Sequence, residues 1–385
     1  MSAVLAILVD SYRELLAKKL FWFVLAISLL IVVSFGSIGF NSRGVSIGYG
    51  LYTIENEVLK EGSPLVMPFM DFAFGTVIVG LWLGWGAIIL ALVSTAEVFP
   101  NFLSAGSIDL VLSKPVRRTT VFFTKYLGSL LFVLLQVAIF CVGTLLVMRW
   151  RVGDWRWGAL LAIPVLVLVF SYLYSVMVLF NVLTRSTLPS LVLTILAWLG
   201  LFSLSFSEGI LLGEFRIPAE VDRDAYAKRI EWYEERIDAA RTEGDSAAIT
   251  RYQGRLESDE RGLEEAQRRV DKWTPIHEAA RLTMLILPKT ASTANLVQRR
   301  LQTDSGMTTA SLLAALSGNE MPEPTPESFE DESRSTQRNR REQEVMRRAE
   351  EYENARPWWM IIGTSLLFEA AVLLVACFIF VRRDN

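Results

Sequence analysis

Apolar residues along this chain gather into six long runs, which are separated by polar stretches of very different lengths. A helix that crosses the hydrocarbon core of a membrane needs roughly 20 mostly apolar residues. The runs lie at about 20–40, 72–93, 127–147, 158–183, 188–206 and 358–381. They predict an all-α integral membrane protein with six transmembrane helices, the first five within 20–206 and the sixth within 357–385.

The first 19 residues alternate apolar and charged positions at helical spacing. Leu8, Tyr12 and Leu15 recur every three or four residues, while most charged residues fall elsewhere on the helix. Asp10 interrupts the apolar run and no small-residue cleavage site follows, which argues against a signal peptide. We expect 1–19 to form an amphipathic interfacial helix on the cytoplasmic leaflet. A charged lead-in to the first span is the alternative.

Between the fifth and sixth runs the chain becomes highly charged. Over 220–272, apolar residues recur at spacings of four and three on both sides of a turn at Gly244. This pattern predicts an antiparallel coiled-coil hairpin, inside an extracytoplasmic insert at 207–356. Residues 279–301 carry an apolar run too short to span, expected at the outer surface of the bundle, and 318–335 is typical of a disordered acidic linker. The hairpin is either a solvated stalk or a docking arm for a partner protein.

Basic residues in the short loops predict the orientation. With six spans, most of them fall on one side, which the positive-inside rule makes cytoplasmic. These residues are Lys18, Lys19, Lys114, Arg117, Arg118, Lys125, Arg185, Arg382 and Arg383. Three arginines oppose the rule: Arg149, Arg151 and Arg156. We therefore expect a multi-pass protein with both termini in the cytoplasm.

Composition argues against several functions. The net charge of -3 is too small to indicate a nucleic-acid partner, and the single histidine, His277, leaves no His-based metal site or Ser-His-acid triad. No phosphate-binding loop, CxxC, HExxH or GxSxG motif is present. The third, fourth and fifth runs contain no ionisable side chain, which disfavours a secondary carrier. We expect no enzyme activity and no cofactor or metal in this chain.

The polar stretch at 94–126, between the second and third runs, has more pattern than a connector needs. Gly106 interrupts what precedes it, and Ile108, Leu110 and Leu112 give a short amphipathic turn. Lys114-Pro115 ends that turn, and basic residues follow beside the next span. A short helix with exposed apolar residues, lying across the cytoplasmic mouth of a membrane domain, could be bound by a partner protein.

This ordered set of residues resembles the signature of type-2 ABC transporter permeases, and is closest to the multi-copper enzyme maturation-type branch. In that family a glycine, a small hydroxyl residue, an acidic-leucine-leucine run, Lys-Pro, a basic residue and a Lys-Tyr-Leu-Gly run lie between spans 2 and 3. Here the corresponding segments are Gly106-Ser107-Ile108-Asp109-Leu110-Val111-Leu112-Ser113-Lys114-Pro115-Val116-Arg117-Arg118 and Lys125-Tyr126-Leu127-Gly128. The resemblance covers roughly 1–206 and 279–385, and the hairpin is not part of the general pattern.

The resemblance implies a permease subunit of an ATP-driven exporter in the bacterial plasma (inner) membrane. A separate ABC ATPase subunit would hold ATP and Mg and dock on the cytoplasmic loop, and two permease chains would pair in the bilayer. The implied coupling residues are Gly106, Ile108, Asp109, Leu110, Leu112, Lys114, Pro115, Arg117, Arg118 and Lys125. The competing hypothesis is a non-transporting membrane scaffold whose extracytoplasmic coiled coil docks a partner. The sequence does not identify a substrate.

Overall fold

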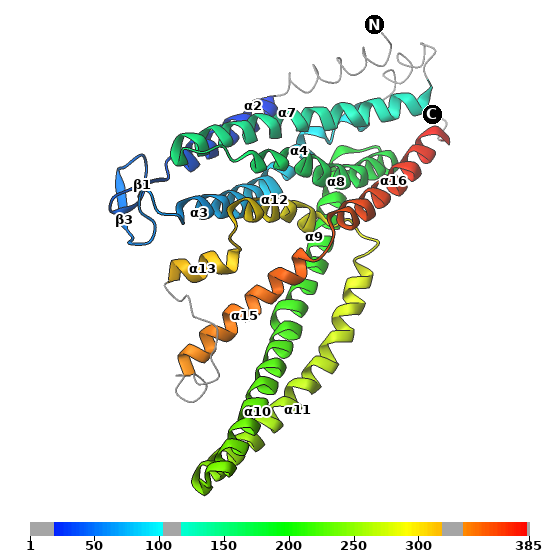
Figure 1. Ribbon diagram of the computed structural model, residues 1–385. Coiled ribbons are helices and arrows are strands. Elements are labelled where there is room, and N and C mark those ends of the chain that lie inside the picture. Colours follow the sequence, from blue (N-terminus) through cyan, green and yellow to red (C-terminus); the bar gives the residue numbers. More distant parts are fainter. Residues whose placement is uncertain (1–18, 103–116, 318–333, 383–385) are drawn as a thin grey trace. The chain divides into compact units, whose positions relative to one another are not determined.

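Helices make up most of this protein (Figure 1). The computed structural model describes residues 19–102, 117–317 and 334–382. The helices up to residue 210 are α2 (Lys19–Gly36), α3 (Val66–Ala73), η1 (Phe74–Ala87), α4 (Ile88–Thr95), α5 (Val98–Phe102), α7 (Arg118–Val152), η2 (Trp157–Leu161), α8 (Ala162–Thr184) and α9 (Thr187–Ile210). The later helices are η3 (Leu211–Arg216), α10 (Ile217–Glu243), α11 (Ser246–Thr283), α12 (Thr290–Ser305), α13 (Thr309–Ser317), α15 (Arg334–Asn354) and α16 (Trp358–Arg382).

Five helical stretches among the described residues are long and apolar enough to cross a membrane, which indicates a multi-pass membrane protein. They are Val66–Phe102, Arg118–Arg151, Trp157–Thr184, Thr187–Glu243 and Trp358–Arg382. The first predicted span corresponds to α2, whose apolar part is the shorter helix Phe21–Gly36. Six spans therefore stay a prediction. The expected interfacial helix at 1–19 lies, apart from Lys19, outside the described residues.

A three-stranded antiparallel sheet follows α2, in the order β1 (Gly39–Asn41), β2 (Gly44–Ile47) and β3 (Tyr52–Glu55). The Asn41 side chain accepts hydrogen bonds from the backbone N–H groups of Arg43 and Gly44, both at 3.0 Å. Gly44 has φ of 144°, and a Cβ there would lie 2.3 Å from the Ile54 carbonyl oxygen. The close approach of β3 thus requires glycine, and α2 ends at Gly36 instead of reaching residue 40 as expected.

The chain divides into two compact units. Unit 1 comprises Met1–Phe202, Ile286–Met307 and Pro357–Asn385, and unit 2 comprises Ser203–Leu285 and Thr308–Arg356. The predicted insert at 207–356 differs from this division, because its segment Ile286–Met307 groups with unit 1. The predicted acidic linker at 318–335 lies almost entirely outside the described residues.

The centre of unit 1 is α8, which packs against α4, α5, α7, α12 and α16. Its side chains are buried around the whole helix, as in Phe170, Tyr172, Tyr174 and Val178. A helix that is apolar all round is one that neighbours cover on every side. Pro164, which as an interior residue would kink a helix, lies instead in the first turn of α8, where it removes no hydrogen bond.

Helix α12 packs inside unit 1, against α3, η1 and α8. Val297 and Leu301, one helical turn apart, have 0% and 1% of their surface exposed. Gly75 on η1 allows the approach, since a Cβ there would be only 3.3 Å from the Gln298 side chain. The expectation that the short apolar run within 279–301 lies at the outer surface of the bundle stays a prediction. The structure adds that α12, which follows that run, buries one face in unit 1.

Unit 2 contains α10 and α11, which pack antiparallel over the expected turn. Gly244 has φ of 74° and ends α10. The Asp245 side chain then caps α11 by accepting from the N–H groups of the next turn at 3.0–3.1 Å. Trp232, Tyr233 and Tyr252 form a buried ring cluster between the two helices. The helices are longer than the predicted 220–272, and the heptad coiled coil and its extracytoplasmic side stay predictions.

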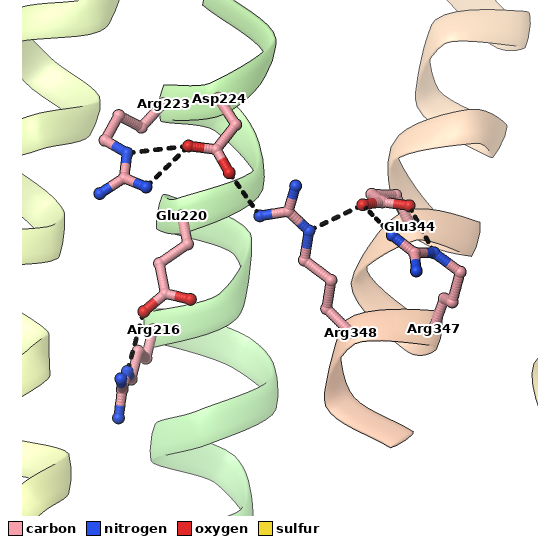
Figure 2. A network of polar contacts seen from close by, with 7 residues as sticks. All are labelled: Arg216, Glu220, Arg223, Asp224, Glu344, Arg347 and Arg348. Atoms are coloured by element: carbon pink, nitrogen blue, oxygen red, sulfur yellow. Dashed lines mark hydrogen bonds and ion pairs between the residues drawn. The ribbon is translucent and has the colours of Figure 1, made fainter. Parts of the chain in front are cut away.

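Helix α15 lies along α10 in unit 2 and is held there by charged side chains (Figure 2). Arg348 of α15 donates to Asp224 at 2.6 Å and to Glu344 at 2.7 Å, and Arg223 donates to the same Asp224 at 2.7 Å. Burial alone would raise the pKa of Glu344, but hydrogen bonds from Arg347 and Arg348 hold that pKa below its usual value. Exposed ion pairs stabilise little one at a time, and α15 also packs Val345, Ala349 and Tyr352 against the buried Leu212, Ile217 and Val221.

Alanine substitutions at two glycines of α11 test how α10 and α11 pack. A Cβ at Gly262 would lie 2.5 Å from the Tyr226 ring of α10, whereas Gly254 has open space around it. We expect Gly262→Ala to lower the free energy of unfolding of unit 2 by about 1–3 kcal/mol through overpacking. Gly254→Ala should instead raise it by about 0.5–1 kcal/mol, because alanine loses less backbone entropy in a helix.

The measurement is denaturant unfolding of the full chain in detergent, followed by helical circular dichroism. Equal effects of the two alanines would contradict this packing of α10 on α11.

Candidate functional site

Most of the predicted coupling residues, from Gly106 to Pro115, lie outside the described residues. The structure does describe both ends of their loop. Residues 94–102, expected to be loop, continue the preceding helix through α4 and α5, because Val98, Phe99 and Phe102 form a buried apolar face. After the loop, α7 begins at Arg118. The expected loop at 94–126 is thus helical at both ends.

The three described coupling residues differ in exposure. Arg117 is exposed and has extended backbone (φ -67°, ψ 138°), so it precedes the first turn of α7. Arg118 is half-buried, and Lys125, expected to place charge beside the span, is only 8% exposed. One helical turn separates Lys125 from the fully buried Val121. Of the three, Arg117 offers the most accessible charge.

Four phenylalanine rings join the two ends of this loop to the C-terminal part of α16. The ring centroids of Phe99 and Phe122 are 5.3 Å apart, those of Phe122 and Phe380 5.6 Å, and those of Phe102 and Phe380 5.9 Å. All four residues, which we name the loop-end cluster, are buried. Aromatic pairs contribute about 0.5–1.5 kcal/mol beyond the burial of their area. A displacement of α5 and α7 at the loop therefore acts directly on α16.

A buried amide joins the same region to the turn between α8 and α9. Asn181 is fully buried and donates from Nδ2 to the Ala96 carbonyl oxygen at 3.3 Å, at the junction of α4 and α5. Its other amide atom accepts from Ser190 of α9. Arg185, with φ of 52°, forms the left-handed residue of the tight α8–α9 turn. The chain sequence shows Asn181 as an isolated amide in an apolar run, but not which helices it would join.

The arginines that oppose the positive-inside rule have partners inside unit 1. Arg156 forms a two-pronged ion pair with Asp71, which is 3% exposed. Arg151 donates from Nε to the Gly36 carbonyl oxygen at 2.6 Å and lies over the Trp150 ring at 4.5 Å. Pairing and cation–π contacts reduce the cost of placing these charges near an interface. Because these arginines are paired, their presence on the side predicted to lie outside argues less strongly against the predicted orientation.

Sequence reasoning missed one buried acid, Glu369 of α16. It is 8% exposed and lies between hydroxyl groups of Tyr126 on α7 and Ser171 on α8. A single carboxylate near the middle of an apolar run of 25 residues is a signal that could have revealed it.

In unit 2, one buried histidine joins α9, η3, α11 and the end of α15. His277 is fully buried, and its Nε2 lies 3.1 Å from a Glu208 carboxylate oxygen. Arg216 Nη1 lies 2.9 Å from His277 Nδ1. An arginine can only donate, so Nδ1 accepts and the proton of the neutral imidazole is on Nε2. Arg356 donates to the same Glu208, and we name these residues the His277 cluster.

This arrangement disfavours the charged form of His277. Burial lowers the pKa of His277, Glu208 opposes that effect, and the charges of Arg216 and Arg356 add to it, so the net direction is downward. A proton on Nδ1 would also place two N–H donors against one another at Arg216.

No group of three or more His, Cys, Asp or Glu side chains able to hold a metal ion occurs among the described residues. No protein-family model, no curated protein and no solved structure matches this chain.

The loop-end cluster predicts unequal effects of two substitutions on α16. Phe380→Ala removes a ring shared by both ends of the loop, and buried Phe→Ala changes cost about 3–5 kcal/mol in water-soluble cores. We expect a smaller but clear loss here, because lipid chains are as apolar as the lost contacts. Phe378 is 54% exposed on the same helix, so Phe378→Ala should change stability much less. Thermal unfolding of the purified chain in one detergent compares them, and equal melting temperatures would contradict the cluster.

The His277 cluster predicts a pH dependence of the stability of unit 2. Because the pKa of His277 is lower in the folded protein, the unfolded chain binds more protons once pH falls below about 6.5. Stability should be complete above that pH and decrease as pH falls below it, by at most about 1.4 kcal/mol per unit of pKa difference. His277 is the only histidine. We therefore expect the denaturation midpoint of His277→Gln to change less between pH 5 and 7 than that of the native chain. An unchanged slope would refute the assignment.

Proposed function

We propose that this chain is the membrane-spanning permease subunit of an ATP-driven type-2 ABC exporter, coupled through the loop between α5 and α7 to a separate ATPase subunit. The observation that carries the proposal is the ordered residue set from Gly106 to Gly128, placed between two apolar helices. Neither the Lys-Pro pair nor any other member is specific by itself. Their order and spacing together support the resemblance to this family.

The structure adds a mechanical reason why this loop suits coupling. Its two ends, α5 and α7, meet at the loop-end cluster and share the Phe380 ring of α16. Asn181 joins the α4–α5 junction to α8 and, through Ser190, to α9. A push on the loop by an ATPase would therefore reach α8, α9 and α16 without an intermediate segment. This supports a coupling role without identifying the cargo.

The expected strength of the docking contact suits such a role. Burying the side chains of Ile108, Leu110 and Leu112 in a groove would contribute a few kcal/mol at about 25 cal/mol per Å². Association and side-chain ordering consume part of this gain. Asp109 and the exposed Arg117 would add charge complementarity, which favours the correct partner more than it raises affinity.

The rest of the proposed assembly follows from the same family pattern. ATP and Mg would be bound by the partner ATPase, and this chain would carry no cofactor. Two permease chains would pair in the bacterial plasma (inner) membrane, with both termini in the cytoplasm. Unit 2 would lie outside the cytoplasm.

A second function, a non-transporting membrane scaffold, is favoured by one observation. Unit 2 is compact by itself, and its hairpin is not part of the family pattern. In that case the hairpin would bind an extracytoplasmic protein and the spans would only anchor it. The two functions differ in whether an ATPase binds the cytoplasmic loop.

Two substitutions in the loop test the proposal, one that reverses a charge and one that introduces a charge at an apolar position. We expect Asp109→Lys and Leu110→Glu each to abolish co-purification of the ATPase and ATP-dependent function, while insertion into the membrane is unchanged. The ATPase is sought first among neighbouring genes by its Walker motifs. Matched controls are Asp154→Lys and Leu51→Glu, since both residues are exposed in loops predicted to lie on the other side of the membrane. If the ATPase still binds both loop variants, the loop is not the coupling site.

A further inference from the structure

Glu369 is a carboxyl group near the middle of the membrane helix α16, and the proposed coupling does not use it. Only 8% of its surface is exposed. An ionisable residue inside a membrane span is costly and usually has a function.

Two hydroxyl groups contact this carboxyl group, and each of them also contacts a backbone carbonyl oxygen. Tyr126 Oη lies 2.6 Å from Glu369 Oε1 and 3.1 Å from the Ser171 carbonyl oxygen. Ser171 Oγ lies 2.9 Å from Glu369 Oε2 and 2.8 Å from the Leu168 carbonyl oxygen. All the atoms belong to α7, α8 and α16 within unit 1.

The number of available protons favours a protonated carboxyl group. Tyr126 and Ser171 supply one hydroxyl proton each, so an ionised Glu369 leaves four contacts with two protons. A protonated Glu369 adds a third. Its O–H can then donate to Tyr126 Oη while Tyr126 donates to the Ser171 carbonyl oxygen, and the short 2.6 Å contact and the 3.1 Å contact are hydrogen bonds at the same time.

The charged and titratable groups around Glu369 do not favour its ionised form. Tyr126 on α7 contacts it and Tyr172 lies on the packed helix α8, and tyrosines are neutral at neutral pH. Two buried lysines lie on or beside the helices that pack on α16. Lys289, just before α12, donates from its ammonium to Thr364 Oγ1 at 2.7 Å, and Lys125 precedes Tyr126 on α7. No ion pair of Glu369 occurs within the described parts of the chain.

We propose that Glu369 is a proton-binding site, which holds its proton while α16 packs on α7 and α8 and releases it to water when that contact opens. On release the carboxyl O–H bond breaks, its electron pair stays on the oxygen, and the proton passes to water. No oxidant or reductant takes part. Contact with water stabilises the carboxylate that the closed packing excludes.

The position of α16 links this site to the rest of unit 1. The same helix carries Phe380 in the loop-end cluster. A movement that begins at the loop therefore also changes the surroundings of Glu369. The protonation of Glu369 does not rest on the proposed permease function, and it is measured without the ATPase.

Infrared spectroscopy of the full chain in lipid bilayers at neutral pH tests the proposal. A protonated carboxyl group has a C=O stretching band that is separate from carboxylate bands, and exposed acids are ionised at neutral pH. We expect the spectrum of the native chain to contain one such band per chain that the spectrum of Glu369→Gln lacks. No difference between the two spectra would overturn the proposal.

A second pair of variants tests the hydrogen bond rather than the presence of the acid. Tyr126→Phe removes the acceptor of the Glu369 proton, so the band should move to higher frequency. Tyr174→Phe removes a hydroxyl that donates to Ser129 at 2.7 Å and leaves the contacts of Glu369 in place, so the band should not move. Equal shifts would contradict the proton assignment.

Chemical labelling gives an answer that does not depend on a variant. An apolar carbodiimide adds to protonated carboxyl groups in apolar surroundings and leaves a stable mass on the glutamate. We expect labelling of Glu369 in the native chain at neutral pH and its decline as pH rises. Absence of the label at neutral pH, while the same reagent labels Glu369 at acidic pH, would show an ionised carboxylate and overturn the proposal.

Discussion

Several polar side chains within the apolar helices of unit 1 pair with one another, and these pairs join α8 to its neighbours. No water is available in a bilayer core, so a polar group there is stabilised by an internal partner. Ser171 of α8 faces Glu369 of α16, Tyr174 donates to Ser129 of α7, and Asn181 joins α9 and the α4–α5 junction. One helix thus supplies polar contacts to α7, α9, α16 and the α4–α5 junction. Apolar packing fills the space between these points.

Unit 2 differs from unit 1, since its helices α10, α11 and α15 carry charges on most of their surface. The apolar contacts there form two small clusters, a ring cluster around Trp232 and Tyr252 and a second one around Leu212, Ile217 and Val221. Arginine–carboxylate pairs such as Arg229–Asp259 add specificity to it. Bidentate pairs fix geometry more than they add stability. The two units are therefore stable for different reasons and should respond differently to salt and to detergent.

The helical, membrane-spanning character of this chain could be predicted because each apolar run is a local signal. The α10–α11 turn could also be placed, since Gly244 and Asp245 carry the turn chemistry themselves. The burial of α12 could not, because only Val297 and Leu301 mark its inner face and their partners are distant in sequence. The same holds for Asp71 with Arg156 and for Glu369 with Tyr126. Periodicity shows which face of a helix is buried, but not which residue faces it. For the candidate coupling site, the pattern at 106–118 carries the hypothesis, and the structure adds only the contacts of the helices on either side.

The place of α16 in unit 1 depends on side-chain contacts more than on chain connections. Gly153 to Arg156 connects α7 to η2, and Arg185-Ser186 connects α8 to α9. In contrast, α16 follows α15 of unit 2 and has no short connection to another helix of unit 1. Side chains therefore hold it on α7 and α8, with Glu369 near its middle and Phe380 near its end. Because both residues lie on one helix, a displacement of α16 that changes one of these contacts also changes the other.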